Sequence, residues 1–296
     1  MKFHLLAVPA VIATLFALPA AAADWAAVGA ALGKTGSVEA GDVYRVGLPR
    51  TDLKVTLDGV ALKPTLALGS WLAFHEMGGQ TMVMGDLVLT HDEVNSVMSA
   101  LIDNGFAITA LHNHLLRSSP ATMYMHVDGH GDAVKLATAL HAALAKSGTP
   151  LGSATTPAAA SAPLDMDVAG VEQTLGGWKG TPNGGVLQFN IPRAKTPKAG
   201  GMTVPTAMGS AIAINFQPTG GGKAAITGDF VLTADEVNPV IKALRANGIE
   251  VTAVHNHMLD DEPRLFFMHF WANADAKTLA GGLHAALEKV KVGKPG

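Results

Sequence analysis

The chain of 296 residues is long enough for two domains of ordinary size. Hydrophobic residues make up 48% of it and charged residues 15%, a composition that excludes a disordered chain. Basic and acidic residues nearly balance, 21 against 24, so the chain lacks the basic field that nucleic-acid binding requires. The absence of cysteine excludes disulfides, thiolate catalysis and cysteine-ligated metal centres.

The first 23 residues have the pattern of a secretory signal peptide. Lys2 and His4 precede an apolar run over 5–18, and small residues with an Ala-x-Ala pattern follow, ending at Ala23. This run is shorter than the roughly 20 residues that a membrane-spanning helix needs, and no later stretch is long and apolar enough to span a membrane. We expect cleavage after Ala23, a mature chain beginning at Asp24, and a periplasmic or secreted location. An uncleaved N-terminal anchor is the alternative.

The remaining sequence contains one module that occurs twice. The segment GDLVLTHDEVNSVMSAL, which begins at Gly85, recurs as GDFVLTADEVNPVIKAL from Gly228, 143 residues later. A repeat of this length indicates tandem domains, because the repeats of a solenoid run about 20–50 residues. Further matches at the same offset are the His-Asn-His triplets at 112–114 and 255–257, and His126 with His269.

The sequence between the two copies has the composition of a linker. Residues 147–165 include few large apolar side chains and many Pro, Ala, Ser and Thr residues. We therefore expect this segment to be the most protease-sensitive part of the interior of the chain, and limited proteolysis there to release two folded halves. The expected division is a signal peptide, a first repeat domain, a linker and a second repeat domain, over residues 1–23, 24–146, 147–165 and 166–296.

Each copy combines short strands with amphipathic helices. In the first copy a capping box at Thr90 begins a helix that Asn104-Gly105 ends, and a second helix is expected over 132–146. In the second copy either Thr233 or Asn238, which precedes a proline, could cap the first helix. A final helix is expected over 275–289. The expected strands are 43–48, 70–75, 106–114 and 123–128, followed by 249–257 and 265–271.

These elements predict an α+β fold. Strands that are connected through short turns and followed by helices form mainly antiparallel sheets. We predict two homologous ββαββα-type modules, each a mainly antiparallel sheet with helices packed on one face.

Three histidines of each copy are expected on one face of a hairpin. Residues two apart on a strand point to the same side, so His112 and His114 project together, and His126 lies on the neighbouring strand. Three imidazoles so placed can bind zinc and leave its fourth position open, and the same donors suit copper, nickel or iron rather than calcium or magnesium. The second copy offers His255, His257 and His269. We expect each copy to bind its own metal ion.

Other roles for these histidines remain open at this stage. They could be structural or hydrogen-bonded, or they could sense pH. The letters H-N-H do not indicate the nuclease of that name, because the residues of that nuclease are dispersed over a ββα unit and a basic surface for DNA is missing here.

Several further polar residues are weaker candidates. Glu93 and Glu236 could supply a fourth ligand or a general base, but the capping box already uses a glutamate at that position. Asp86 and Asp229 each follow a glycine and are interpreted as turn residues. The remaining candidates are expected to be structural, namely His141 and His284 on the last helix of each copy and the core methionines Met123 and Met125.

The repeated block GD(L/F)VLTxDEVNxVxxAL…NG…TAxHNHxL…MH resembles the LppY/LpqO family of exported bacterial proteins. The resemblance covers both copies and implies export and duplication, without an activity. The family is named after lipoproteins, and this chain departs from that pattern because it has no lipobox cysteine.

The sequence thus predicts an exported protein that binds a transition metal, for trafficking, for sequestration or for metal-dependent hydrolysis with a small-molecule substrate. It shows no confident general base, so catalysis stays open, as does the oligomeric state. The alternative is a metal-free module that binds a ligand or partner and uses its histidines structurally.

Overall fold

The computed structural model describes residues 23–152 and 163–295. The expected signal peptide except Ala23, and residues 153–162 of the expected linker, lie outside the described residues. Among the described helices, none is long and apolar enough to cross a membrane.

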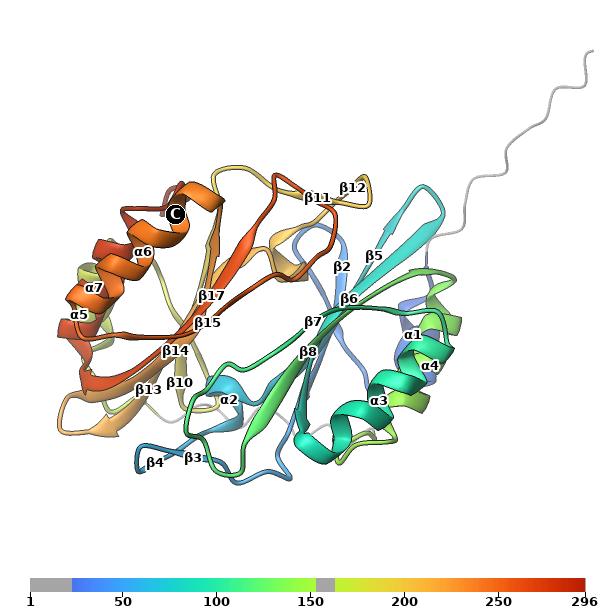
Figure 1. Ribbon diagram of the computed structural model, residues 1–296, viewed down its shortest axis with the longest axis horizontal. Helices are drawn as coiled ribbons and strands as arrows, with labels where there is room; N and C mark the ends of the chain where they lie inside the picture. Colours follow the sequence, from blue (N-terminus) through green and yellow to red (C-terminus); the bar gives the residue numbers. More distant parts are fainter. Residues whose placement is uncertain (1–22, 153–162, 296) are drawn as a thin grey trace, which may run out of the picture.

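Each copy contributes one six-stranded antiparallel sheet (Figure 1). The first sheet has the order β1-β2-β5-β6-β8-β7, formed by β1 (Ser37–Glu39), β2 (Val43–Pro49), β5 (Gly69–Met77), β6 (Gln80–Thr90), β8 (Thr122–Gly131) and β7 (Ala107–His112). The second has the order β9-β10-β13-β14-β17-β15, formed by β9 (Thr181–Asn183), β10 (Val186–Pro192), β13 (Ala211–Gly220), β14 (Lys223–Leu232), β17 (Phe266–Asp275) and β15 (Glu250–His255). The two copies therefore share one topology.

The helices cover the outer face of each sheet, and the inner faces of the two sheets are turned toward each other (Figure 1). The first sheet is covered by α1 (Trp25–Leu32), α3 (His91–Asp103) and α4 (Ala133–Leu144). The second is covered by α5 (Val168–Thr174), α6 (Ala234–Ala246) and α7 (Ala276–Leu287). The α+β class, the duplication and the placement of helices on one face are confirmed.

Strands β6 and β14 were not placed by the sequence pattern. They lie at the centre of each sheet and are buried on both faces, so they lack the polar alternation of a half-exposed strand. In β6, Val83 and Leu87 pack with the helices of the first copy, while Met82 and Met84, the neighbours of Val83 in the strand, join the hydrophobic core of the second copy. The inner face of β6 therefore forms part of the interface between the copies.

The capping boxes decide where the central helices begin. Thr90 and Thr233 each form the complete box, with Glu93 and Glu236 at the third helical position. In the second copy, α6 begins before Pro239 and includes it, at the cost of one backbone hydrogen bond. The structure thus selects Thr233 rather than Asn238 as the cap.

Each copy also extends an arm over the sheet of the other. The arm of the first copy consists of β3 (Thr56–Leu57), β4 (Val60–Ala61) and α2 (Pro64–Ala67), and its apolar side chains pack with Val186, Ala225 and Trp271 of the second copy. The arm of the second copy consists of β11 (Lys198–Ala199), β12 (Met202–Thr203) and η1 (Thr206–Met208), and β16 (Asp261–Glu262) pairs with its edge. Its Met208 belongs to the same core as Val43 and Ala73.

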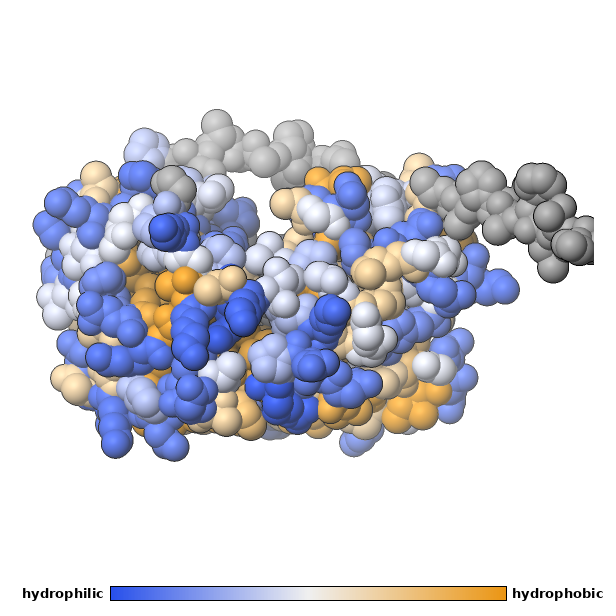
Figure 2. Space-filling view, turned by 90° about the horizontal axis from the view of Figure 1, so that it is seen from above, coloured by the Kyte–Doolittle hydropathy of each residue, from blue (hydrophilic) through white to orange (hydrophobic). Residues whose placement is uncertain are grey.

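The two arms hold the copies together, because each arm packs on the sheet of the other copy. Hydrophilic side chains cover much of the face shown in Figure 2, with smaller hydrophobic areas between them. The apolar surface of the arms is mostly buried against the opposite sheets. The space between the sheets is therefore a shared interior of both copies.

Candidate metal centre and adjoining cavity

Six histidines from the two copies converge between the inner faces of the sheets. Their rings pack in three pairs, and each pair joins one copy to the other. The ring centroids are 3.6 Å apart for His112 and His255, 3.7 Å for His114 and His269, and 3.8 Å for His126 and His257. Because 255, 257 and 269 are the repeat equivalents of 112, 114 and 126, this pairing is that of an approximate twofold axis.

The expected shared face of the hairpin is present in each copy. His126 on β8 lies opposite Ala110 of β7, and His112 at the end of β7 lies two residues further on the same side. The ring centroid of His112 is 5.1 Å from that of His126 and 5.0 Å from that of His114. The sequence thus predicted which side chains point together within one hairpin.

The grouping into possible metal sites differs from the expectation of one separate triad per copy. The sets of nitrogen and oxygen atoms that lie within 4.8 Å of one another are His112, His114 and His269; His112, His126 and His255; and Asp229, His255 and His257. The first two sets take ligands from both copies. The packing of two homologous hairpins brings together residues that no local pattern connects, and whether each copy binds its own ion stays a prediction.

One of these distances matches the geometry of a bound metal ion. The Nε2 atoms of His112 and His269 are 3.3 Å apart. Two nitrogens, each about 2.05 Å from a tetrahedral zinc ion, are separated by about 3.3 Å. His269 donates its Nδ1 proton to the carbonyl of Gly228 at 2.7 Å, so its Nε2 lone pair is free to bind a cation.

Asp86 and Asp229 belong to this site, and their interpretation as turn residues was wrong. Each lies in the middle of a central strand, on the inner face, directly opposite His126 or His269. Asp229 Oδ2 is 3.0 Å from His257 Nε2, and Asp86 Oδ2 is 3.5 Å from the equivalent His114 Nε2. We refer to the six histidines, Asp86 and Asp229 as the interface cluster.

The Gly-Asp pair in the sequence has a steric cause. A Cβ atom on Gly228 would lie 2.0 Å from the carbonyl oxygen of Ala213, and one on Gly85 would lie 2.6 Å from Leu72. Glycine therefore permits the close approach of the central strands just before each aspartate. The signal that could have revealed the role of Asp86 is its position two residues after Met84, on the inner side of an otherwise apolar strand.

Aromatic side chains fix the outer histidine rings. His114 stacks on Tyr124 at a centroid distance of 3.4 Å, and His257 stacks on the equivalent Phe267 at the same distance. Tyr124 is itself held by a hydrogen bond from its hydroxyl to the carbonyl of Ala67 at 2.9 Å. Packing against these aromatic rings therefore positions His114 and His257.

Burial sets the protonation of the interface cluster. Burial lowers the pKa of all six histidines, and neighbouring imidazoles lower it further for every one of them except His255; the pKa of His269 falls to about 3. Burial, together with the charge of Asp229, raises the pKa of Asp86 to about 8, and burial also raises the pKa of Asp229. Near neutral pH the imidazoles are therefore neutral, the state in which they bind metals.

The cluster has an unusual number of unsatisfied polar atoms. Among the described residues, nine buried side-chain nitrogen and oxygen atoms lack a hydrogen-bond partner, and seven of them belong to the interface cluster. Such atoms are rare in folded proteins because each one costs about 1–3 kcal/mol. The seven atoms are Asp86 Oδ1, His112 Nδ1, His114 Nε2, His126 Nε2, Asp229 Oδ1, His255 Nε2 and His257 Nε2.

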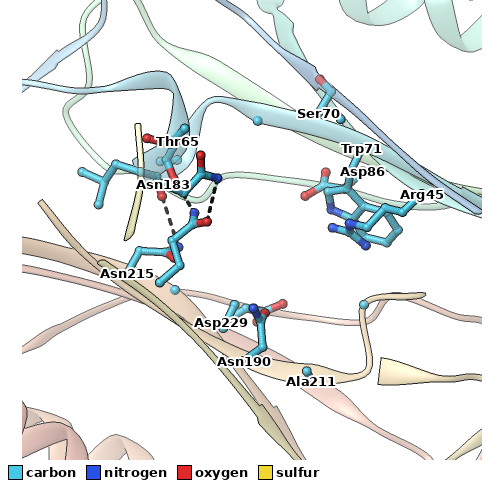
Figure 3. A pocket seen from close by; sticks show the side chains of 18 of the residues that line it. Arg45, Thr65, Ser70, Trp71, Asp86, Asn183, Asn190, Ala211, Asn215 and Asp229 are labelled. Atoms are coloured by element: carbon cyan, nitrogen blue, oxygen red, sulfur yellow. Dashed lines mark hydrogen bonds between the residues drawn. The ribbon is translucent and has the colours of Figure 1, made fainter. Parts of the chain in front are cut away.

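A cavity of about 870 Å³ adjoins the interface cluster and lies between the two sheets. His114, His257 and His269 line it together with both aspartates. Figure 3 shows side chains of both copies facing each other across this space. Its volume is in the range of small-molecule sites.

The weaker candidates lie outside the site. Glu93 accepts hydrogen bonds from the backbone N–H of Thr90 and pairs with Arg50 at 2.8 Å, and Glu236 pairs with Arg193 in the same way. Both glutamates are therefore structural. His141 hydrogen-bonds the carbonyl of Leu32. The expectation of core methionines is confirmed, since Met125 is in the first core and Met123 packs against it, while His284 on α7 lies 3.9 Å from Glu288, the residue that follows the helix.

Comparison with known proteins identifies a family. Residues 26–146 and 169–289 each match the family described as Domain of Unknown Function (DUF1259). The chain belongs to this family and contains two copies of its domain. No curated protein matches the chain.

Solved structures offer only distant likenesses. A trimeric bacterial microcompartment shell protein, PduB, is 14% identical, with a TM-score of 0.21 over 86% of this chain and 89% of that chain. EtuB from Clostridium kluyveri is 8% identical, with a TM-score of 0.20 over 85% of this chain and 90% of that chain. At these scores neither likeness carries an argument about function.

Proposed function

We propose that this protein binds a transition metal ion in the interface cluster, with ligands from both copies of its domain. The observation that carries the proposal is the set of seven buried, unpartnered nitrogen and oxygen atoms that converge in one place. A cation bound among these groups would take several of these atoms as ligands and so give them the partners that they lack within the protein.

The donor set favours a particular class of ion. Neutral imidazole nitrogens with a carboxylate suit zinc, copper, nickel or iron, and zinc in particular binds such sets in tetrahedral geometry. The proposed metal would also lower the pKa of Asp86 and Asp229, because a nearby cation favours the ionised carboxylate. The sets share His112 and His255, which makes them one connected centre.

The adjoining cavity supports metal-dependent hydrolysis as a second candidate function. A zinc-like ion with an open coordination position supplies a water molecule whose pKa falls toward about 7. Asp86 and Asp229 border both the histidines and the cavity, so either could accept a proton from a water molecule there. Trafficking or sequestration would use the same ligands without this step.

Elemental analysis of the untagged protein tests the proposal. We expect near-stoichiometric transition metal in protein purified without added chelator, and its loss from the His112→Ala variant. His141→Ala is the matched control, because that side chain lies on α4, outside the interface cluster. A metal-free wild-type protein that takes up no added zinc would overturn the proposal and favour a metal-free ligand-binding module.

Export is the second part of the proposal. It rests on the signal-peptide pattern of residues 1–23 and on the resemblance to the LppY/LpqO family. Asp24, the proposed first residue of the mature chain, is the N-cap of α1 and accepts a hydrogen bond from the backbone of Ala27. Intact-mass analysis of the periplasmic fraction should find a chain that begins at Asp24, and a chain that retains Met1 there would contradict this.

A further inference from the structure

The cavity between the sheets has two different ends, although homologous strands build them. The interface cluster is the same in both copies, but the cavity wall is not. On the inner strands, the first copy has Arg45 where the second has Gln188, 143 residues later. It also has Trp71 after Gly69-Ser70, where the second copy has Ala211 after Gly209-Ser210. A symmetric centre beside an asymmetric wall is suited to a ligand that binds in one orientation.

Arg45 is a cation with unused donors in this wall. Its guanidinium lies 4.2 Å from the centre of the Trp71 ring, and Nη1 donates a hydrogen bond to the carbonyl of Ala207. Within the part of the chain that the structure describes, no carboxylate lies within 4.0 Å of the guanidinium, and Nε and Nη2 have no protein partner. The planar guanidinium is suited to binding an oxyanion through two parallel hydrogen bonds.

The equivalent residue of the second copy is already satisfied. Gln188 accepts a hydrogen bond from Asn183 at 2.9 Å and donates one to the carbonyl of Thr65 at 2.8 Å. Its two partners, Thr65 and Asn183, lie together on one side of the cavity (Figure 3). Among the described residues that line the cavity, Arg45 therefore supplies the charged donors that a ligand could use.

The remaining wall places polar and flat surfaces around the same space. Asn190 lines the cavity where the first copy has Gly47. The wall from the second copy therefore presents an amide side chain, and the wall from the first copy leaves space for a ligand at the equivalent position. The indole of Trp71 lies against Gly209, where a Cβ atom would come within 2.8 Å of the ring. In Figure 3, Arg45, Trp71 and Asp86 lie together on one side, facing Asn190 and Asp229 on the other.

We propose that the cavity binds a small oxyanion, a carboxylate or a phosphate group, through the guanidinium of Arg45. The rest of the ligand lies toward Asn190 and the interface cluster. The part of this inference that involves a metal rests on the proposed function. A divalent ion in the interface cluster would offset the negative charge of Asp86 and Asp229, and Arg45 would then attract the anion. Glu39 lies at the same end of the cavity, but it is solvent-exposed and therefore competes only weakly with the ligand for Arg45.

Titration calorimetry with two probes tests this inference. Protein of known metal content is titrated separately with inorganic phosphate and with acetate, which distinguishes the two oxyanion chemistries. We expect one of them to bind, and binding to weaken about tenfold or more in Arg45→Gln, which introduces the side chain of the second copy. Metal content should stay unchanged in this variant. Arg45→Lys keeps the positive charge but lacks the planar pair of donors. It replaces Arg45→Gln in the titration if the glutamine variant does not fold.

The control is Arg245→Gln in the last turn of α6, away from the cavity. Equal binding by the wild type and both Arg45 variants, or no binding of either probe to folded wild-type protein, would overturn the oxyanion site. If the wild type holds no metal and takes up no added zinc, the proposed function fails by itself. In that case the metal-free protein is titrated with the same two probes. Binding that depends on Arg45 supports the oxyanion site, and absence of such binding overturns it.

Discussion

His112 and His269 face each other across the two copies with their Nε2 atoms 3.3 Å apart, although 157 positions separate them in the chain. This relationship changes what a mutation in one copy does to the other. The proposed metal ion would take ligands from both sheets at this position, so it would link the two domains as well as fill a site.

Loss of His112 should therefore affect the whole centre. This residue belongs to two of the three ligand sets, and each of these sets includes a residue from the second copy. We expect His112→Ala to weaken zinc binding by more than the roughly 10–100-fold that loss of an outer-shell partner causes. Calorimetric titration of metal-free protein measures this. A variant that retains one binding event of normal affinity would instead show two independent sites.

The two aspartates should contribute in the same direction as the histidines. Asp86→Asn and Asp229→Asn each remove a carboxylate from the cluster while keeping its size and hydrogen-bonding capacity. We expect both variants to fold and to lose metal affinity, because the amide is neutral and a weaker ligand. Zinc titration compared with the Asp52→Asn control tests this, since Asp52 lies at the Arg50 pair instead. Unchanged zinc affinity in both variants would remove the aspartates from the centre.

The stability of the metal-free protein should fall as the pH drops below about 6.5. The pKa of each cluster histidine is lowered by burial, so these side chains stay neutral in the folded state, while the unfolded chain takes up protons near pH 6.5. Acid therefore favours unfolding, by up to about 1.4 kcal/mol per pH unit for each additional proton.

Asp86 acts in the opposite direction. With a pKa of about 8 it is already protonated in the folded state at neutral pH, whereas the unfolded chain protonates it only near pH 4. Burial raises the pKa of Asp229 as well, so two carboxyl groups oppose six histidines, and the net effect of acid is destabilisation. Urea unfolding between pH 8 and 5 measures it, and His126→Asn combined with His269→Asn should flatten the curve. A free energy of unfolding that does not change over this range would contradict the burial of neutral histidines.

Glu236 should matter for stability and not for metal. Its carboxylate joins the buried Arg193 to the N-terminus of α6 and to the backbone of Lys291. Removing one partner of a buried pair costs about 3–5 kcal/mol. We expect Glu236→Ala to lower the free energy of unfolding by about this amount. In the first copy Arg50 keeps Asp52 as a second partner, so Glu93→Ala should cost less. Loss of metal from a folded Glu236 variant would contradict the structural role.

Cleavage between the copies should not separate them. Residues 147–165 are expected to be cut first, but the arms of each copy pack on the sheet of the other, and Thr109 and Thr252 donate hydrogen bonds to carbonyls across the interface. Limited proteolysis followed by size-exclusion chromatography should yield two fragments that elute together. Fragments that elute as separate folded halves would show that the interface is weaker than its burial indicates.

The sequence by itself determined the local parts of this protein. The offset of 143 residues predicted the duplication, the capping boxes and the Asn-Gly pairs predicted the central helices, and strand parity predicted that His112 and His126 share a face. Each of these signals acts between residues that are close in the chain or repeated along it, so it is visible in the pattern of residue types.

Only the tertiary structure decided how the site is assembled. Central strands that are buried on both faces show no alternation of polar and apolar residues. The sequence therefore did not predict β6 and β14, nor the positions of Asp86 and Asp229 within them. The pairing of His114 with His269 depends on two sheets packing face to face, a relation between surfaces that no periodicity records. Packing of the homologous faces around an approximate twofold axis therefore turned two predicted triads into one shared cluster.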